Sequence, residues 1–459
     1  MPTKGNKNKD KKGATINVEQ WVFLLFAVLT YLFWRFAGQS LLSYHEQLQL
    51  FLWTPDYMVG RLQLPGGLVL FCSEFVVQFY NNFNIGALLL TLLFVGFLYI
   101  ASDVIKRHVF SKAPATAIVP TLMLIVASCN SDVMTSVVVA FVVVMLLIKF
   151  LPREGLYRHL YVCIASTLGY VAVGPLVVVM LLYAVVEGLC RDVVRQIDTA
   201  FDIAGVVLMA LSVYVGSLLV PYGLDDLMRG LGYWRNGEVS WMCCAVGLFV
   251  VLMPLLRYVS TKQRLLAVTS LGAVACLTVA TFITHNSADI QRLEYVLLTR
   301  TNRWSTIIEK SDGKLSDDPT EYAATLLAQW KTDKIESQRL VSALSQRKDF
   351  NSLTYLSVLS DIYFNIGLVN ASQRFAFELK ELIPNHNCSG RILSRLAETA
   401  LVSGRKELAR RYITILKYAP FYRYKAEQLE RLLLDDEALQ RHKTYGPLSK
   451  SFPENDVMF

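Results

Sequence analysis

The chain has 459 residues, of which 54% are hydrophobic and 18% charged, with a mean hydropathy of +0.39. These values exceed the usual range of a soluble domain, and the apolar excess lies almost wholly before residue 285. The net charge of +8 does not indicate a nucleic-acid partner, because the lysines and arginines lie in short clusters between apolar runs. Most of the eight cysteines sit inside apolar stretches, which excludes a disulfide framework.

The first segment, residues 1–17, is polar and basic, and the apolar run that follows lacks a small-residue cleavage site. We therefore expect a cytoplasmic tail and an uncleaved first helix. Residues 18–284 then predict a transmembrane bundle of about nine helices. The nine apolar segments are 18–36, 85–105, 113–127, 133–148, 160–173, 175–189, 203–220, 239–256 and 265–283.

Basic clusters between these segments predict the orientation of the chain. With nine crossings, sixteen lysines and arginines fall on the side of the N-terminus, whereas the opposite loops hold only Arg61, Arg229 and Arg235. The bias favours a cytoplasmic N-terminus and an external C-terminal domain. Residues 160–189 can be one helix kinked at Gly174-Pro175 or two helices, and the Arg191 and Arg195 cluster favours two.

The first outer loop, residues 38–84, contains the most prominent polar cluster, Tyr44-His45-Glu46. The loop mixes apolar, polar and aromatic residues, as helices on a membrane surface do, and Pro65-Gly66-Gly67 predicts a turn between two of them. A carboxylate beside apolar walls can have its pKa raised and act as a general base, so Glu46 is a candidate catalytic residue, with Tyr44 and His45 as substrate-binding neighbours. The alternative is a solvated glutamate on a surface helix.

The second and third outer loops add further candidates. Asp132 can approach Glu46 across the mouth of the bundle, and paired acids suit a divalent metal or a divided acid and base role. Asp132 can equally be an N-cap of the next helix. Arg229 and Arg235 can clamp a phosphate of the substrate or anchor the loop at lipid headgroups.

Residues 285–440 read as successive amphipathic helices, followed by a tail at 441–459. Two stretches share a layout, with Ala371 and Ala409 38 positions apart and Pro384 and Pro420 36 apart. This spacing is close to the tetratricopeptide period of about 34 residues. The chain is thus expected to be all-α, with a tetratricopeptide-like helical-repeat domain whose concave surface binds a protein or glycan partner.

Five motifs are spread along the chain: Glu46-Gln47 through Phe51, Pro65-Gly66-Gly67, Gln78-Phe79-Tyr80, the stretch from Gly404 to Tyr412, and Phe421-Tyr422-Arg423. With them the chain resembles, across nearly its whole length, a family of uncharacterised Gram-negative bacterial membrane proteins, classed as a domain of unknown function. The resemblance implies a bacterial inner membrane, with the C-terminal domain in the periplasm, and no known activity.

The layout is also similar to that of the C-superfamily of glycosyltransferases, in which an acid follows the first helix and another lies in a short second outer loop. By position, the resemblance implies that Glu46 is the catalytic base and Asp132 the second acid, acting on a lipid-linked sugar. The first loop departs from the pattern because it lacks an Asp-X-Asp or Glu-X-Asp pair, and the chain has fewer helices than most members.

Two functional hypotheses follow. The first is an enzyme that moves a sugar from a polyprenyl-phosphate carrier to an envelope acceptor, with Glu46 deprotonating the acceptor and Asp132 or Arg235 holding the phosphate or a divalent metal. The second is a noncatalytic membrane scaffold whose periplasmic repeats bind a protein partner. A transporter is disfavoured, because the central helix interiors lack the carboxylates of an ion relay.

Overall fold

The computed structural model describes residues 18–108, 113–190, 196–259, 271–272, 274–275, 278–281, 287–346, 352–383 and 388–452. This part of the chain is helical apart from turns, loops and one β-bridge between Val133 and Trp234, so the predicted all-α class is confirmed. The basic tail at 1–17, most of the apolar segment 265–283 and Pro384 lie outside the described residues.

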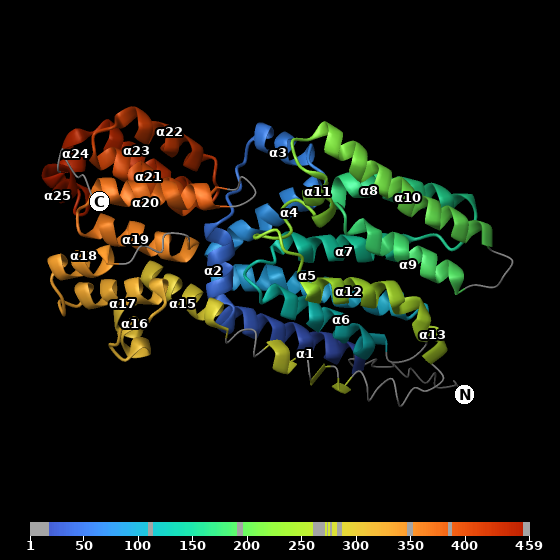
Figure 1. Ribbon diagram of the computed structural model, residues 1–459. Helices are drawn as coiled ribbons and strands as arrows, with labels where there is room; N and C mark the ends of the chain where they lie inside the picture. The colour runs from blue at the N-terminus through green and yellow to red at the C-terminus, as the bar shows by residue number, and fades with distance from the viewer. Residues whose placement is uncertain are drawn as a thin grey trace, which may run out of the picture.

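Long apolar helices form a bundle in the first half of the chain (Figure 1). Four are long and apolar enough to cross a membrane, judged by length and composition: Glu19–Ala37, Phe83–Ile105, Thr199–Leu219 and Trp241–Tyr258. The helices of the bundle are α1 (Val18–Leu32) with the π-helix η1 (Phe33–Ala37), α5 (Phe83–Ile105), α6 (Ala113–Ser128), α7 (Thr135–Phe150), α8 (Leu156–Val173), α9 (Val177–Leu189), α10 (Gln196–Leu219) and α12 (Trp241–Leu252), followed by η4 (Met253–Leu255) and α13 (Leu256–Val259).

Contacts between loops show that successive helices alternate in direction. At one end, which carries α2 (Gln39–Gln47) and is called here the α2 end, the backbone N–H of Met134 donates to the Tyr233 carbonyl at 3.0 Å. At the opposite end, Lys149 pairs with Asp103 at 3.0 Å. Arg158, near the start of α8, pairs there with Glu187, near the end of α9. The two-helix interpretation of 160–189 is therefore confirmed, with the break at Gly174.

The outward faces of the bundle carry large apolar side chains. On α1, Leu25, Leu29 and Leu32 are exposed and recur every three or four residues, which places them on one helical face, and Phe36 of η1 is exposed as well. The outer face of α10 is similarly apolar over 203–219. Exposed apolar surface of this extent is stable in contact with hydrocarbon rather than with water.

The C-terminal helices lie beyond the α2 end of the bundle (Figure 1). The chain turns between α19 and α20 at Gly367, whose φ is 92°, and between α21 and α22 at Gly404, whose φ is 74°. The small side chains of Ala371 in α20 and Ala409 in α22 are buried. The helices are α15 (Ala288–Arg300), α16 (Trp304–Ser311), α17 (Pro319–Lys331), α18 (Ser337–Ser345), α19 (Leu353–Asn365), α20 (Val369–Leu382), α21 (Gly390–Val402), α22 (Lys406–Lys417), α23 (Arg423–Leu434), α24 (Asp436–Arg441) and α25 (Tyr445–Ser451). The segment predicted as a tail, 441–459, thus contains a helix, α25, which contacts α21.

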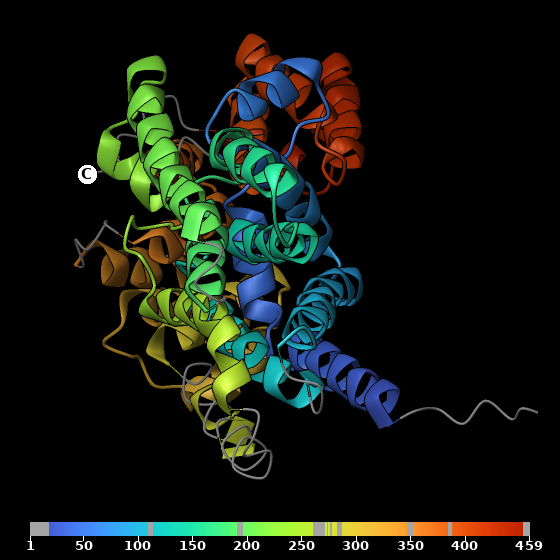
Figure 2. The same ribbon diagram turned by 90° about the vertical axis from the view of Figure 1, so that its right-hand side faces the viewer.

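The loop between α1 and α5 folds into three helices, α2, α3 (Pro55–Leu62) and α4 (Gly67–Gln78), and the short η2 (Phe79–Asn81). The predicted turn at Pro65-Gly66-Gly67 separates α3 from α4, and Gly66 has a φ of 79°. The interpretation of the loop as surface helices is wrong for α2, because Leu41 and Leu42 pack in the bundle core while Leu48 packs in the core of the C-terminal helices. The segment after α2 continues along the C-terminal helices, where the Trp53 N–H donates to the Tyr418 carbonyl at 2.9 Å (Figure 2).

Candidate functional site

The residues predicted as a site gather around α2, the helix enclosed between the bundle and the C-terminal helices. Tyr44 packs against both apolar cores. Its neighbours His45 and Glu46 are both buried, and each has a charged partner from a different part of the chain. The site therefore divides into two sides.

On the side of the C-terminal helices, Glu46 is 1% exposed and forms a cluster with Arg300 and Tyr422, called here the junction cluster. Arg300 Nη1 donates to Glu46 Oε2 at 3.1 Å, and the Tyr422 hydroxyl donates to Oε1 at 2.7 Å. Burial, reinforced by the charge of Glu46, raises the pKa of Tyr422 well above its usual range, so this hydroxyl remains a donor. The solvated-glutamate alternative is wrong, and both carboxylate oxygens have partners.

Arg300 connects the junction cluster to two more segments of the outer loop. Its Nη1 also donates to Ser43 Oγ at 3.0 Å, and its Nη2 donates to Asn81 Oδ1 at 2.7 Å. One guanidinium at the end of α15 thus bonds to α2 and to η2, which precedes α5. The planar donor geometry of arginine suits such simultaneous contacts.

On the side of the bundle loops, Arg235 is 3% exposed and contacts Tyr44 and His45. Its Nη2 lies 3.2 Å from His45 Nδ1, and its guanidinium lies 4.7 Å from the centroid of the Tyr44 ring. Burial, followed by the positive charge of Arg235, lowers the pKa of His45 to about 3. His45 is therefore neutral at ordinary pH and accepts the hydrogen bond of Arg235.

Asp132 reaches this side mainly through its backbone. Its carbonyl accepts from the Arg235 N–H at 2.8 Å, and its Oδ1 accepts from Asn236 Nδ2 at 2.8 Å. Burial raises the pKa of Asp132, whereas Arg235 and Asn236 oppose the shift. The N-cap alternative is wrong, because Met134 occupies the cap position of α7 and no side chain caps it.

Arg229 lies apart from this group. It is exposed and donates to the Gly237 carbonyl at 3.1 Å, which closes its own loop. The structure thus brings Tyr44, His45 and Arg235 together with the backbone of Asp132, while Glu46 engages the C-terminal helices. Among the described residues, no group of three or more His, Cys, Asp or Glu side chains is arranged to hold a metal ion.

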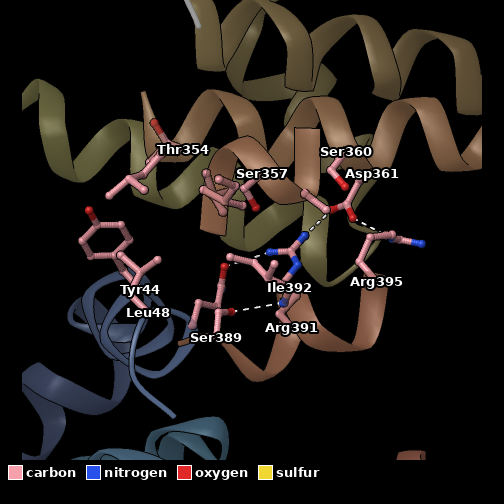
Figure 3. A pocket seen from close by; sticks show the side chains of 15 residues that line it. Tyr44, Leu48, Thr354, Ser357, Ser360, Asp361, Ser389, Arg391, Ile392 and Arg395 are labelled. Atoms are coloured by element: carbon pink, nitrogen blue, oxygen red, sulfur yellow. Dashed lines mark hydrogen bonds and ion pairs between the residues drawn. The ribbon is translucent and has the colours of Figure 1, made fainter. Parts of the chain in front are cut away.

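A chain of ion pairs that the sequence did not reveal extends the junction into the C-terminal helices. Gln47 of α2 accepts from Arg391 at 2.8 Å, and Arg391 in turn pairs with Asp361. Arg395 joins Asp361 at 2.7 Å to Glu398 at 2.9 Å. Figure 3 shows Asp361 between the two arginines, across a small cavity from Tyr44 and Leu48.

The pKa values of the two carboxylates in this series of ion pairs lie below their usual range. Although burial alone would raise the pKa of Asp361, Arg391 and Arg395 hold that pKa below its usual value. Glu398 behaves likewise, because Lys425 and Arg395 oppose the effect of burial on its pKa. Both carboxylates are therefore ionised at ordinary pH.

Next to these ion pairs lies a cavity of about 290 Å³ in the C-terminal helices, called here the basic cavity. Its lining holds more cationic than anionic side chains, together with two aromatic rings and two asparagines. The residues that matter for its chemistry are Arg300, Arg391, Arg395, Lys425, Asp361, Glu398, Trp304, Tyr422, Asn302 and Asn365. The one available sequence signal was the recurrence of Arg391, Arg395 and Glu398 every three or four residues on the otherwise apolar, buried α21.

A second buried ion-pair cluster lies at the opposite end of the bundle. Arg158 is fully buried and donates to Asp202 of α10 at 2.7 Å and to Glu187 of α9 at 3.0 Å. It also donates to the Pro152 and Ala184 carbonyls. These bonds hold α8, α9 and α10 together, a structural role for charges inside the bundle.

Comparison with known proteins agrees with the expected kinship to an uncharacterised family. No curated protein and no solved structure matches the chain. A family of unknown function (DUF6057) matches residues 15–459, nearly the full length. The chain belongs to this family of unknown function.

Proposed function

We propose that this protein is a noncatalytic scaffold of the bacterial inner membrane, whose periplasmic C-terminal domain binds a protein partner. The observation that carries the proposal is the junction cluster, in which Glu46 is enclosed by Arg300 and Tyr422. A general base needs a route by which its substrate can approach, and Glu46 is only 1% exposed. A carboxylate with both oxygens bonded across two parts of the chain suits a rigid joint better.

Rigid attachment gives the C-terminal helices a fixed position relative to the bundle. Three segments of the outer loop contact them: α2 through Glu46 and Gln47, η2 through Asn81, and the segment after α2 through Trp53. Because a partner loses less freedom on binding a preorganised surface, such attachment favours recruitment. The proposed scaffold holds its binding surface at a set distance from the membrane.

The exposed apolar faces of α1 and α10 support placement in a membrane, and the basic clusters support the orientation. The C-terminal helices lie at the α2 end, whereas Glu19 pairs with Lys106 at the opposite end. A cytoplasmic N-terminus thus places the C-terminal domain outside. The paired helices, turned at Gly367 and Gly404, support a tetratricopeptide-like stack.

The basic cavity supports a partner with acidic side chains. Arg300, Arg391, Arg395 and Lys425 line it against two carboxylates, Asp361 and Glu398. Lys425 is the most exposed of the four cations, at 43%, and its ammonium group pairs with Glu398 at 2.7 Å, so an acidic ligand shares this group with Glu398. An acidic segment that enters the cavity forms charge-assisted hydrogen bonds with these groups.

A photo-crosslinking amino acid at Asn365, in the lining of the basic cavity, tests the proposal in cells. We expect one discrete protein adduct on the full-length chain. Lys425→Glu removes the net positive charge of the lining and abolishes the adduct, whereas Lys443→Glu, a change of the same kind at an exposed lysine outside the lining, leaves it unchanged. Absence of a protein adduct, or an adduct indifferent to Lys425→Glu, contradicts the scaffold.

A further inference from the structure

A larger cavity, of about 570 Å³, lies at the α2 end of α1, between the bundle and the first C-terminal helices. Figure 1 shows α15 and α16 next to this end of α1. Cavities of about 300–1,000 Å³ are the usual size for small-ligand sites. The lining includes Phe36, Gln39, Ser40, Glu294, Arg303 and Lys310.

One side of the cavity continues the exposed apolar face of α1. Leu25, Leu29, Leu32 and Phe36 are 60%, 58%, 43% and 68% exposed, and Phe36 also lines the cavity. A hydrocarbon chain that lies along this face in the membrane therefore leads directly to the cavity mouth. The α1 face ends there, because the chain turns at Gly38 into the buried α2.

The opposite side of the cavity is polar and carries a surplus of positive charge. Lys310 forms an ion pair with Glu294, so their charges compensate. The side chain of Arg303 is exposed, and the described residues offer it no hydrogen-bond or ion-pair partner. Arg303 is thus a guanidinium at a cavity mouth, available to a planar or tetrahedral oxyanion.

The backbone around the cavity has a local irregularity that the sequence pattern does not require. Residues Phe33–Ala37 form a π-helix, and Gln39 Nε2 donates to the Arg35 carbonyl at 2.6 Å. Single π-helical turns within α-helices occur frequently at functional sites. Here the turn places Phe36 between the apolar face of α1 and the polar lining.

We propose that this cavity binds the phosphate headgroup of an anionic lipid, with the lipid chain along α1 and the phosphate at Arg303. The shared chemistry is a phosphate on a long hydrocarbon chain, which either a membrane phospholipid or a polyprenyl phosphate supplies. Cationic side chains next to a membrane face attract such headgroups. The site is separate from the basic cavity and does not depend on the proposed scaffold role.

The test is native mass spectrometry of the full-length protein in detergent, titrated separately with phosphatidylglycerol, a polyprenyl phosphate and diacylglycerol. We expect retention of at least one of the two phosphate lipids and none of diacylglycerol, which lacks the phosphate. Arg303→Glu is expected to lower retention at least about tenfold, since the change replaces an attraction by a repulsion. Comparison of the titrations with phosphatidylglycerol and with polyprenyl phosphate identifies which of the two lipids supplies the phosphate.

The controls separate a binding defect from a folding defect. Arg339→Glu, the same reversal at an exposed arginine of α18 outside the cavity, retains lipid like the unchanged chain, and Arg303→Lys keeps most of the binding. Unfolding temperatures of all variants are measured in parallel. Equal retention by the unchanged chain and by a folded Arg303→Glu variant overturns the proposal, as does equal retention of diacylglycerol.

Discussion

His45 and Glu46 are adjacent buried residues of α2, and their polar side chains are stabilised in different ways. His45 remains neutral and accepts a hydrogen bond from Arg235, whereas Glu46 forms an ion pair with Arg300 and accepts a hydrogen bond from Tyr422. An unpaired charge in either place would carry a large desolvation cost. Each residue therefore leads to a distinct prediction.

Glu46→Gln removes the charge opposite Arg300 while it preserves the shape of the side chain. Removal of one partner of a buried ion pair costs about 3–5 kcal/mol, and the 23% exposure of Arg300 reduces this to roughly 1–3 kcal/mol. We expect a lower unfolding temperature of the full-length protein in detergent, measured by intrinsic fluorescence. Glu378→Gln, at the exposed pair with Arg374, is the matched control and should shift it little.

The same variant tests the sugar-transfer hypothesis, which stays a prediction. If Glu46 deprotonates an acceptor hydroxyl, Glu46→Gln changes the envelope glycan profile. The scaffold predicts an unchanged profile, and loss of the ion pair with Arg300 lowers the unfolding temperature in either case. An unchanged unfolding temperature therefore contradicts the role of Glu46 as a joint.

His45 predicts a pH dependence of stability. An unfolded histidine titrates near pH 6.5, whereas burial and then Arg235 lower the pKa of His45 to about 3 in the folded chain. Between these values the unfolded chain binds more protons, so the free energy of unfolding falls as the pH drops from about 6.5 toward 3. The contribution of this group is at most about 1.4 kcal/mol per pH unit. Denaturant unfolding from pH 7 to 5 should show a shallower slope for His45→Asn, and identical slopes contradict the assignment.

At the scale of elements, the turn between α8 and α9 depends on Gly174, whose φ is 91° and ψ −161°. A Cβ there would lie 3.0 Å from the Tyr233 hydroxyl oxygen, and Tyr233 donates to the Val173 carbonyl. Gly155, before α8, has nearly the same backbone angles, but a Cβ there would meet nothing within 4 Å. A comparison of alanine substitutions at Gly155 and Gly174 therefore separates the cost of backbone strain from the cost of the contact with Tyr233.

Gly155→Ala should lower stability by about 1–3 kcal/mol, the cost of a side chain in this backbone region. Gly174→Ala adds the contact with Tyr233 and should lower the unfolding temperature further. Thermal unfolding of the two variants in the same detergent provides the measurement. Equal shifts would show that the Tyr233 contact adds nothing.

At the scale of the whole molecule, alternation of the helices places Glu154, between α7 and α8, at the end opposite the C-terminal helices. In a chain whose native cysteines are replaced by alanine, Lys314→Cys and Glu154→Cys are both exposed positions. We expect an impermeant maleimide to label Lys314→Cys in intact spheroplasts and Glu154→Cys only after lysis. The opposite pattern would invert the proposed orientation.

Much of the architecture could be predicted from local patterns. Apolar runs predicted the helices of the bundle, and Gly174-Pro175 predicted the break between α8 and α9. The burial of α2 could not be predicted in this way. The apolar residues of α2 have the spacing of a surface helix. Glu46 is enclosed only because the C-terminal helices pack on the other side of α2.

Amino-acid order alone determined where helices form, which stretches avoid water and where the basic clusters lie, because these properties depend on neighbours a few residues apart. Only the tertiary structure decided the partners of Glu46, which meets Arg300 and Tyr422 across 254 and 376 positions. A buried charge is stable only beside a complementary group. Which group lies beside the charge depends on how whole helices pack, and a local sequence pattern contains no information about that packing.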